Sequence, residues 1–120
     1  MIDTHCHLND PKFKNDLDEV ISRALDAGIR AMVVVGYDVR SSIRAVEISQ
    51  RYDGVYATVG LHPYEAERYK DDNLREIEEL LKPESAKRTM KVNILAQTHN
   101  PSGIFLRYFP TLLKFQTPNF

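Results

Sequence analysis

Two histidines near the amino terminus have a spacing that suits a metal ion. His5 and His7 flank Cys6 and follow Asp3 in the sequence. Alternate side chains of a strand share a face, so on a strand both imidazoles would project together, with Asp3 behind them. Neighbouring imidazole nitrogens suit a divalent transition metal, and a carboxylate behind them can orient a ligand. The alternative is two ordinary histidines near a chain terminus.

A third histidine follows a second strand-like segment. His62 stands in the sequence Val-Gly-Leu-His-Pro at residues 59–63. Catalytic side chains of α/β proteins gather where parallel strands end. If strands end near His7 and Gly60, the three histidines would lie together at the carboxyl edge of the sheet. The alternative is that His62 is a loop residue before Pro63. His99 has no convincing strand before it, and we expect it to be a solvated loop residue.

The elements that would position these histidines alternate between strand and helix. Short extended or apolar segments at residues 2–8, 31–35 and 55–59 predict strands. Apolar residues at three- and four-residue steps predict helices between and after them. The expected start signals are Asn9-Asp10-Pro11 for the first helix, Asp38, Ser41 and Ser42 for the second, and Asp71, Asp72 or Asn73 for the third. These three helices should end at Gly28, Asp53-Gly54 and Pro83, respectively.

Three successive βα units imply parallel strands with right-handed crossovers. The order suits either a doubly wound sheet or the first part of a (β/α)₈ barrel. A barrel needs about 250 residues, so a chain of 120 residues could supply only half of one. We therefore expect an α/β fold: the three amino-terminal βα units of such a barrel, followed by an irregular tail.

The composition changes near residue 84. Residues 1–84 hold all 17 acidic residues and 11 Lys/Arg, a net charge of 11 − 17 = −6, whereas residues 85–120 hold no acid and the other 5 Lys/Arg. Residues 91–96 are a weakly marked fourth strand, residues 97–103 resemble a turn, and Pro110 and Pro118 interrupt any helix or central strand beyond it. We therefore predict an α/β region at residues 1–84 and a divergent tail at residues 85–120, either frameshifted or disordered.

Several classes of protein are disfavoured. Cys6 is the only cysteine, so it cannot form an internal disulfide, and we expect a small buried side chain and not a nucleophile. No apolar run approaches the roughly 20 residues that cross a bilayer. The amino terminus lacks the basic start of a signal peptide, so a cytoplasmic location is expected. The acidic run Glu76, Glu78 and Glu79 is best explained as a solvated helix face.

Three segments of the sequence occur in a recognisable order: Met-Ile-Asp-Thr-His-Cys-His-Leu-Asn at residues 1–9, Val-Val-Val-Gly at residues 33–36, and Tyr-Ala-Thr-Val-Gly-Leu-His-Pro at residues 56–63. In their order and spacing they resemble the TatD family of metal-dependent deoxyribonucleases. The resemblance implies a (β/α)₈ barrel, one or two divalent ions (Mg²⁺, Mn²⁺ or Zn²⁺), and hydrolysis of phosphodiester bonds in DNA, often from a 3′ end. It further implies that His5 and His7 are metal ligands and that His62 is a catalytic and substrate-binding residue at the mouth.

The sequence departs from the family in its second part. The family's next motif, Gly-Glu followed by Gly-Leu-Asp, is absent, and no acid follows Glu84. Two histidines cannot satisfy a four- to six-coordinate ion, so we expect a truncated chain with weak or no activity. The alternatives are a non-catalytic half-barrel that assembles with itself or another chain through its open sheet edge, and a small metal-binding module built on His5, His7 and His62. A reading frame after codon 84 that encodes the missing motif would support a frameshift.

Overall fold

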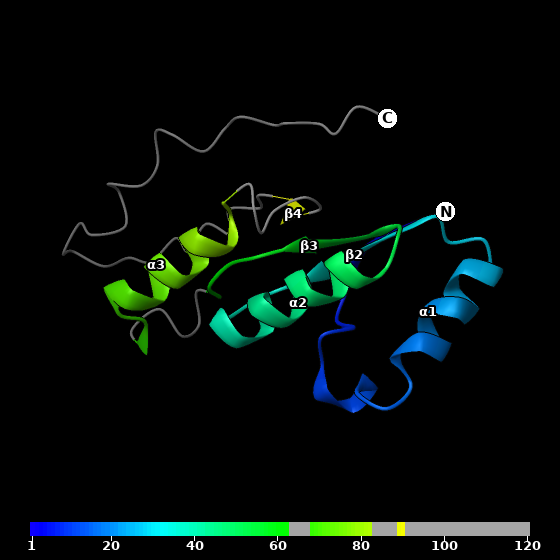
Figure 1. Cartoon of the computed structure of the whole chain (residues 1–120), viewed down its shortest axis with the longest axis horizontal. Coiled ribbons are helices and arrows are strands. Elements are labelled where there is room, and N and C mark those ends of the chain that lie inside the picture. The colour runs from blue at the N-terminus through cyan, green and yellow to red at the C-terminus, as the bar shows by residue number, and fades with distance from the viewer. Residues whose placement is uncertain (63–67, 83–88, 91–120) are drawn as a thin grey trace.

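In the part of the chain that the structure describes, four parallel strands form one sheet with helices between them (Figure 1). The computed structural model describes residues 1–62, 68–82 and 89–90. In chain order the elements are β1 (Ile2–Cys6), a 3₁₀ turn (Pro11–Phe13), α1 (Leu17–Asp26), β2 (Ala31–Val35), α2 (Val39–Arg51), β3 (Val55–Thr58), α3 (Asp71–Leu80) and β4 (Thr89–Met90). The strands are ordered β1-β2-β3-β4, and each neighbouring pair is parallel.

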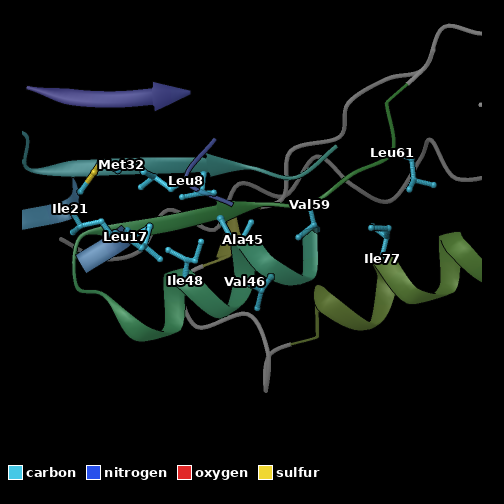
Figure 2. Close-up of a cluster of buried hydrophobic side chains, with 13 residues drawn as sticks. Leu8, Leu17, Ile21, Met32, Ala45, Val46, Ile48, Val59, Leu61 and Ile77 are labelled. Carbon is cyan, nitrogen blue, oxygen red and sulfur yellow. The ribbon is translucent and has the colours of Figure 1, made fainter. Parts of the chain in front are cut away.

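This arrangement distinguishes between the two architectures left open by the sequence. A doubly wound sheet reverses its strand order and carries helices on both faces, whereas these strands follow chain order without a reversal. Buried side chains of α1, α2 and α3 all join one hydrophobic cluster against the sheet (Figure 2). The described helices therefore cover a single face, as the outer helices of a barrel do.

The core lies between that face and the helices. Met32 pairs with Val55 and Val34 pairs with Ala57, so these four side chains point to the same side of the sheet. Val34, Val55 and Ala57 are 0% exposed, and burying a valine side chain contributes about 1.5–3 kcal/mol. On the helix side the cluster is completed by Leu17, Ile21, Ala45, Val46, Ile48 and Ile77. The predicted strands at residues 31–35 and 55–59 are confirmed, the second ending at Thr58.

The second helix begins at the predicted cap. The carboxylate of Asp38 accepts a hydrogen bond from the Ser41 N–H, and the Ser41 hydroxyl accepts one from the Asp38 N–H. These reciprocal bonds satisfy two backbone donors at the helix start. Ala45, Val46 and Ile48 form the buried face of this helix, whereas Ile43 is 40% exposed.

The first helix begins later than predicted. The side chain of Asp10 accepts from the Lys12 N–H as expected of a cap, but Pro11–Phe13 form only a 3₁₀ turn, and α1 starts at Leu17. The intervening Lys-Asn-Asp at residues 14–16 offers no apolar residue to the core, and Asn and Asp side chains compete with helical backbone bonds. Gly28 ends α1 at φ +88° as predicted, a left-handed conformation that glycine adopts without a Cβ clash.

The third helix and the last strand complete the described part. The Asn73 side chain accepts from the Lys70 N–H at 2.9 Å and so caps α3. β4 pairs with β3 at Ala57–Thr58 and lies beyond the boundary predicted at residue 84. The predicted strand at residues 91–96, the turn at residues 97–103 and the tail beyond it lie outside the described residues. Within the described residues, no helix has the length and apolar character to cross a membrane.

Candidate metal centre

A bulge in β1 controls where the first two histidines point. Asp3 pairs with Met32 and Cys6 pairs with Val34, so three steps along β1 match two steps along β2. The extra residue reverses the alternation, because a bulge re-aims the side chains that come after it. Cys6 consequently lies on the helix-covered face, and His5 and His7, on either side of it, lie on the opposite face, where both are exposed.

The two imidazoles are close enough to share an ion. Their Nε2 atoms are 3.2 Å apart, and the rings meet edge to face with centroids separated by 5.0 Å. With metal–nitrogen bonds of about 2.1 Å, a separation of 3.2 Å corresponds to an N–metal–N angle of about 100°. That angle lies between octahedral and tetrahedral values, so the pair fits two adjacent positions on a divalent ion. Among the described residues, no third His, Cys, Asp or Glu joins them.

Asp3 does not occupy the position expected from simple alternation. Its Oδ1 accepts a hydrogen bond from the backbone N–H of His5 at 3.1 Å. The bulge separates Asp3 from the face of the imidazoles, so the expectation that the carboxylate lies behind them was wrong. Asp3 instead holds the backbone of the bulge and thereby fixes His5 indirectly.

Cys6 lies on the core side of the strand, but it is half-buried and so less enclosed than the small buried side chain that the sequence predicted. Its Sγ donates to the carbonyl oxygen of Val33 at 3.3 Å. Burial, and secondarily the charge of Asp3, raise the pKa of the Cys6 thiol from 9.0 to about 11. A protonated, half-buried thiol is a poor nucleophile and a poor metal ligand.

His62 is brought to the same edge of the sheet by the segment after β3. Its backbone N–H donates to the carbonyl of Tyr37 at 2.7 Å, just beyond the end of β2. The hydroxyl of Ser42 donates to the Gly60 carbonyl and accepts from the Gly60 N–H, at 3.3 and 3.2 Å. Through these bonds Ser42 holds the segment just before His62 against α2. His62 is half-buried and follows the carboxyl end of β3, as predicted.

Tyr37 is a residue of this edge that sequence reasoning missed. Its ring meets the His7 ring at an interplanar angle of 72°, with centroids 5.8 Å apart. Its carbonyl receives the His62 N–H, so one residue contacts both histidine-bearing segments. Its position directly after Gly36 at a strand end was the available signal.

Asn9 ties the end of β1 to the end of β2. Its buried amide donates to the carbonyls of Val35 and Ser41, at 3.0 and 2.9 Å. The sequence suggested a helix-capping role at residues 9–11, which Asp10 performs for the 3₁₀ turn. Asn9 instead fixes the distance between the segment that carries His7 and the turn that carries Tyr37.

Comparison with known proteins places this geometry in a family. The model of the TatD related DNase family matches residues 2–94. Over 80 residues the chain is 41% identical to the uncharacterized metal-dependent hydrolase YabD of Bacillus subtilis, covering 67% of this chain and 31% of the relative. It is 32% identical to the 3′-5′ ssDNA/RNA exonuclease TatD of Edwardsiella piscicida over 83 residues, 68% of this chain and 32% of that protein.

A solved structure agrees with the sequence relatives. The crystal structure of YjjV, a TatD homologue from Escherichia coli, superposes with a TM-score of 0.63 at 31% identity, covering 72% of this chain and 34% of that one. The chain spans about a third of the length of these relatives. Its sheet and helices match the amino-terminal part of the TatD barrel, as the sequence predicted. The chain therefore belongs to the family of TatD related DNases.

Proposed function

We propose that this chain supplies His5 and His7 as the first two ligands of a divalent ion in a phosphodiesterase that acts on nucleic acid. The observation that carries the proposal is the 3.2 Å separation of their Nε2 atoms on the uncovered face, at the carboxyl end of β1. A bound ion of this kind activates water and stabilises negative charge on phosphate oxygens. The metal-dependent name of the relative in Bacillus subtilis supports a divalent ion, and Mg²⁺, Mn²⁺ and Zn²⁺ are all candidates.

We propose single-stranded DNA as the substrate and His62 as the residue that contacts it. Several relatives are named 3′-5′ ssDNA/RNA exonucleases. The backbone of His62 is held by Tyr37 at the edge where β1 and β3 end. An imidazole there can donate a hydrogen bond to a phosphate oxygen or transfer a proton to a leaving group.

These 120 residues alone should turn over weakly or not at all. Two imidazoles leave at least two positions of a tetrahedral ion to other ligands, and the described residues provide no third donor beside them. The sequence contains no acid after Glu84, so residues 85–120 cannot contribute a carboxylate side chain. Further ligands would have to come from additional βα units, in this chain or in another.

The test separates binding from turnover. The full chain is titrated with Co²⁺, Mn²⁺ and Zn²⁺, and single-stranded DNA is then incubated with chain and metal. We expect metal binding by the wild type, its loss in the His5→Ala/His7→Ala double variant, and weak or no turnover. Equal binding by the wild type and the double variant would refute the metal centre. Efficient turnover that the double variant lacks would refute the predicted weak activity while supporting the site.

A second candidate is a half-barrel completed by another copy. Among the described residues β1 has a neighbour on one side only, and Ile2 on this edge strand is 60% exposed. Unpaired strand edges favour pairing with another chain. Sedimentation equilibrium tests this: a dimer that Ile2→Lys dissociates would support assembly, and a monomer at all concentrations would exclude it.

A further inference from the structure

The backbone of Tyr37 is fixed although its side chain is 41% exposed. Its N–H donates to the Ser41 hydroxyl at 2.9 Å, and its carbonyl accepts from the His62 N–H at 2.7 Å and the Tyr69 hydroxyl at 3.4 Å. Asn9 holds the neighbouring turn through Val35 and Ser41. Both polar groups of the Tyr37 backbone are hydrogen-bonded, yet its aromatic ring is exposed and does not join the hydrophobic core. Packing in the core therefore does not explain the position of this ring.

The ring instead extends the row formed by the two histidines. Tyr37 meets His7 edge to face at 5.8 Å, and His7 meets His5 edge to face at 5.0 Å. Edge-to-face pairs at such distances are favourable beyond the area they bury. A histidine ring that already lies in its binding orientation loses less side-chain freedom when it binds an ion.

We propose that Tyr37 is a positioning residue for the metal centre: its ring holds the His7 imidazole in the orientation that places the two Nε2 atoms together. The inference rests on the proposed metal-binding function of His5 and His7. It assigns the role to the aromatic ring and not to the hydroxyl, because the ring makes the contact with His7. The backbone carbonyl that holds His62 is unchanged by side-chain substitution, so the effect of the ring can be measured by itself.

The experiment compares three variants of the full chain. Tyr37→Ala removes the ring, Tyr37→Phe retains it without the hydroxyl, and Ile43→Ala removes a similarly exposed apolar side chain (40%) from α2 as a control. Each is titrated with Co²⁺, and its thermal unfolding is recorded. We expect Tyr37→Ala to weaken Co²⁺ binding roughly two- to tenfold, whereas Tyr37→Phe and Ile43→Ala bind as the wild type does. Equal affinity of Tyr37→Ala and wild type would overturn the proposal, as would equal weakening in Tyr37→Phe.

A second measurement tests the contact without metal. In NMR spectra of the metal-free chain, the His7 ring protons should carry a ring-current shift that Tyr37→Ala removes and Tyr37→Phe preserves. If the wild type binds no Co²⁺, the proposed function fails, and these shifts still decide whether Tyr37 holds His7. If the wild type binds and Tyr37→Ala changes neither affinity nor shift, only the positioning role is refuted.

Discussion

The two faces of the sheet are built from neighbouring residues of the same strands, yet their side chains differ in kind. On the helix-covered face Met32, Val34 and Ala57 are buried in a continuous apolar layer. On the opposite face His5 and His7 are exposed, although each adjoins Cys6, whose thiol packs on the core side. The same short strand therefore packs against the core through one face and carries the proposed metal ligands on the other.

The comparison teaches that the two properties should be separable by substitution. Side chains on the covered face should change the free energy of unfolding and leave the metal site intact. Side chains on the open face should change metal binding and leave the free energy of unfolding nearly unchanged. Residues at the junction of the two faces should alter both.

The largest effect is expected from Ile48→Ala on the helix side of the core. Ile48 is 1% exposed and packs in the hydrophobic cluster between helices and sheet. Truncating such a side chain to alanine lowers the free energy of unfolding by about 2–5 kcal/mol. Urea unfolding measures the loss. A Co²⁺ affinity that falls in parallel, under conditions where the variant is folded, would contradict the separation of the faces.

Gly36→Ala should disturb both faces at once. A Cβ at Gly36 would lie 2.6 Å from the Ser42 Cα and 2.8 Å from the Thr58 carbonyl oxygen, so α2 would have to move away from the sheet. Overpacking of this kind costs about 1–3 kcal/mol. The expected signature in calorimetry and Co²⁺ titration is lower stability together with weaker binding.

Gly28→Ala provides the matched control for Gly36→Ala. Gly28 has φ +88° and nothing within 4 Å of its added Cβ, so the variant should lose stability through backbone strain, about 1–2 kcal/mol. It lies at the end of α1, away from the histidines. If its Co²⁺ affinity fell as far as that of Gly36→Ala, the weaker binding of Gly36→Ala could not be assigned to a change at the edge of the sheet that carries the histidines.

A smaller contribution to stability should come from the Cys6 thiol and depend on pH. Burial raises its pKa to about 11 in the folded chain, from a usual value of 9.0. A raised pKa means that the contribution is fully present below pH 9.0 and is lost as pH rises through about 11. Comparing wild type with Cys6→Ala in urea unfolding from below pH 9.0 to about pH 11 isolates this group. A difference between the two proteins that does not change with pH would contradict the shift.

The smallest effect on stability is expected where the effect on binding is largest. His5→Ala and His7→Ala remove exposed side chains, which should change the free energy of unfolding by no more than about 0.5 kcal/mol. Both should abolish Co²⁺ binding, since a single imidazole is a weak site. A loss of stability comparable to that of Ile48→Ala would show that the open face also supports the fold.

Features set by local chemistry could be predicted from the sequence. β2 has the predicted limits because residues 31–35 form a continuous apolar run, rich in valine and bounded by glycine. The start of α2 was predictable because Asp38 and Ser41 cap it over three residues. The parallel direction of the strands also followed from the alternation of strand and helix. Their order did not, and the observed order together with the single helix-covered face decides between the two architectures.

Features that depend on contacts between distant residues could not be predicted. The bulge in β1 exists only relative to β2, so alternation along β1 by itself placed Asp3 on the wrong face. Asn9 bonds to residues 26 and 32 positions away, and no local pattern reveals that pairing. The position of Tyr37 at the end of β2 could be predicted, but its contact with His7 could not, because the two residues lie far apart in the chain.

The bulge makes the length of β1 as important as its composition. The Arg30 N–H donates to the Met1 carbonyl at 2.8 Å, so the beginning of the strand is anchored and cannot slide along β2. If the bulge closed with every residue kept, His5 would pair with Val34 and both imidazoles would turn to the helix-covered face. Deleting Thr4 would instead remove the extra residue and leave Cys6 opposite Val34, so both imidazoles would keep their face. The single extra residue in β1 therefore decides on which side of the sheet the two histidines lie.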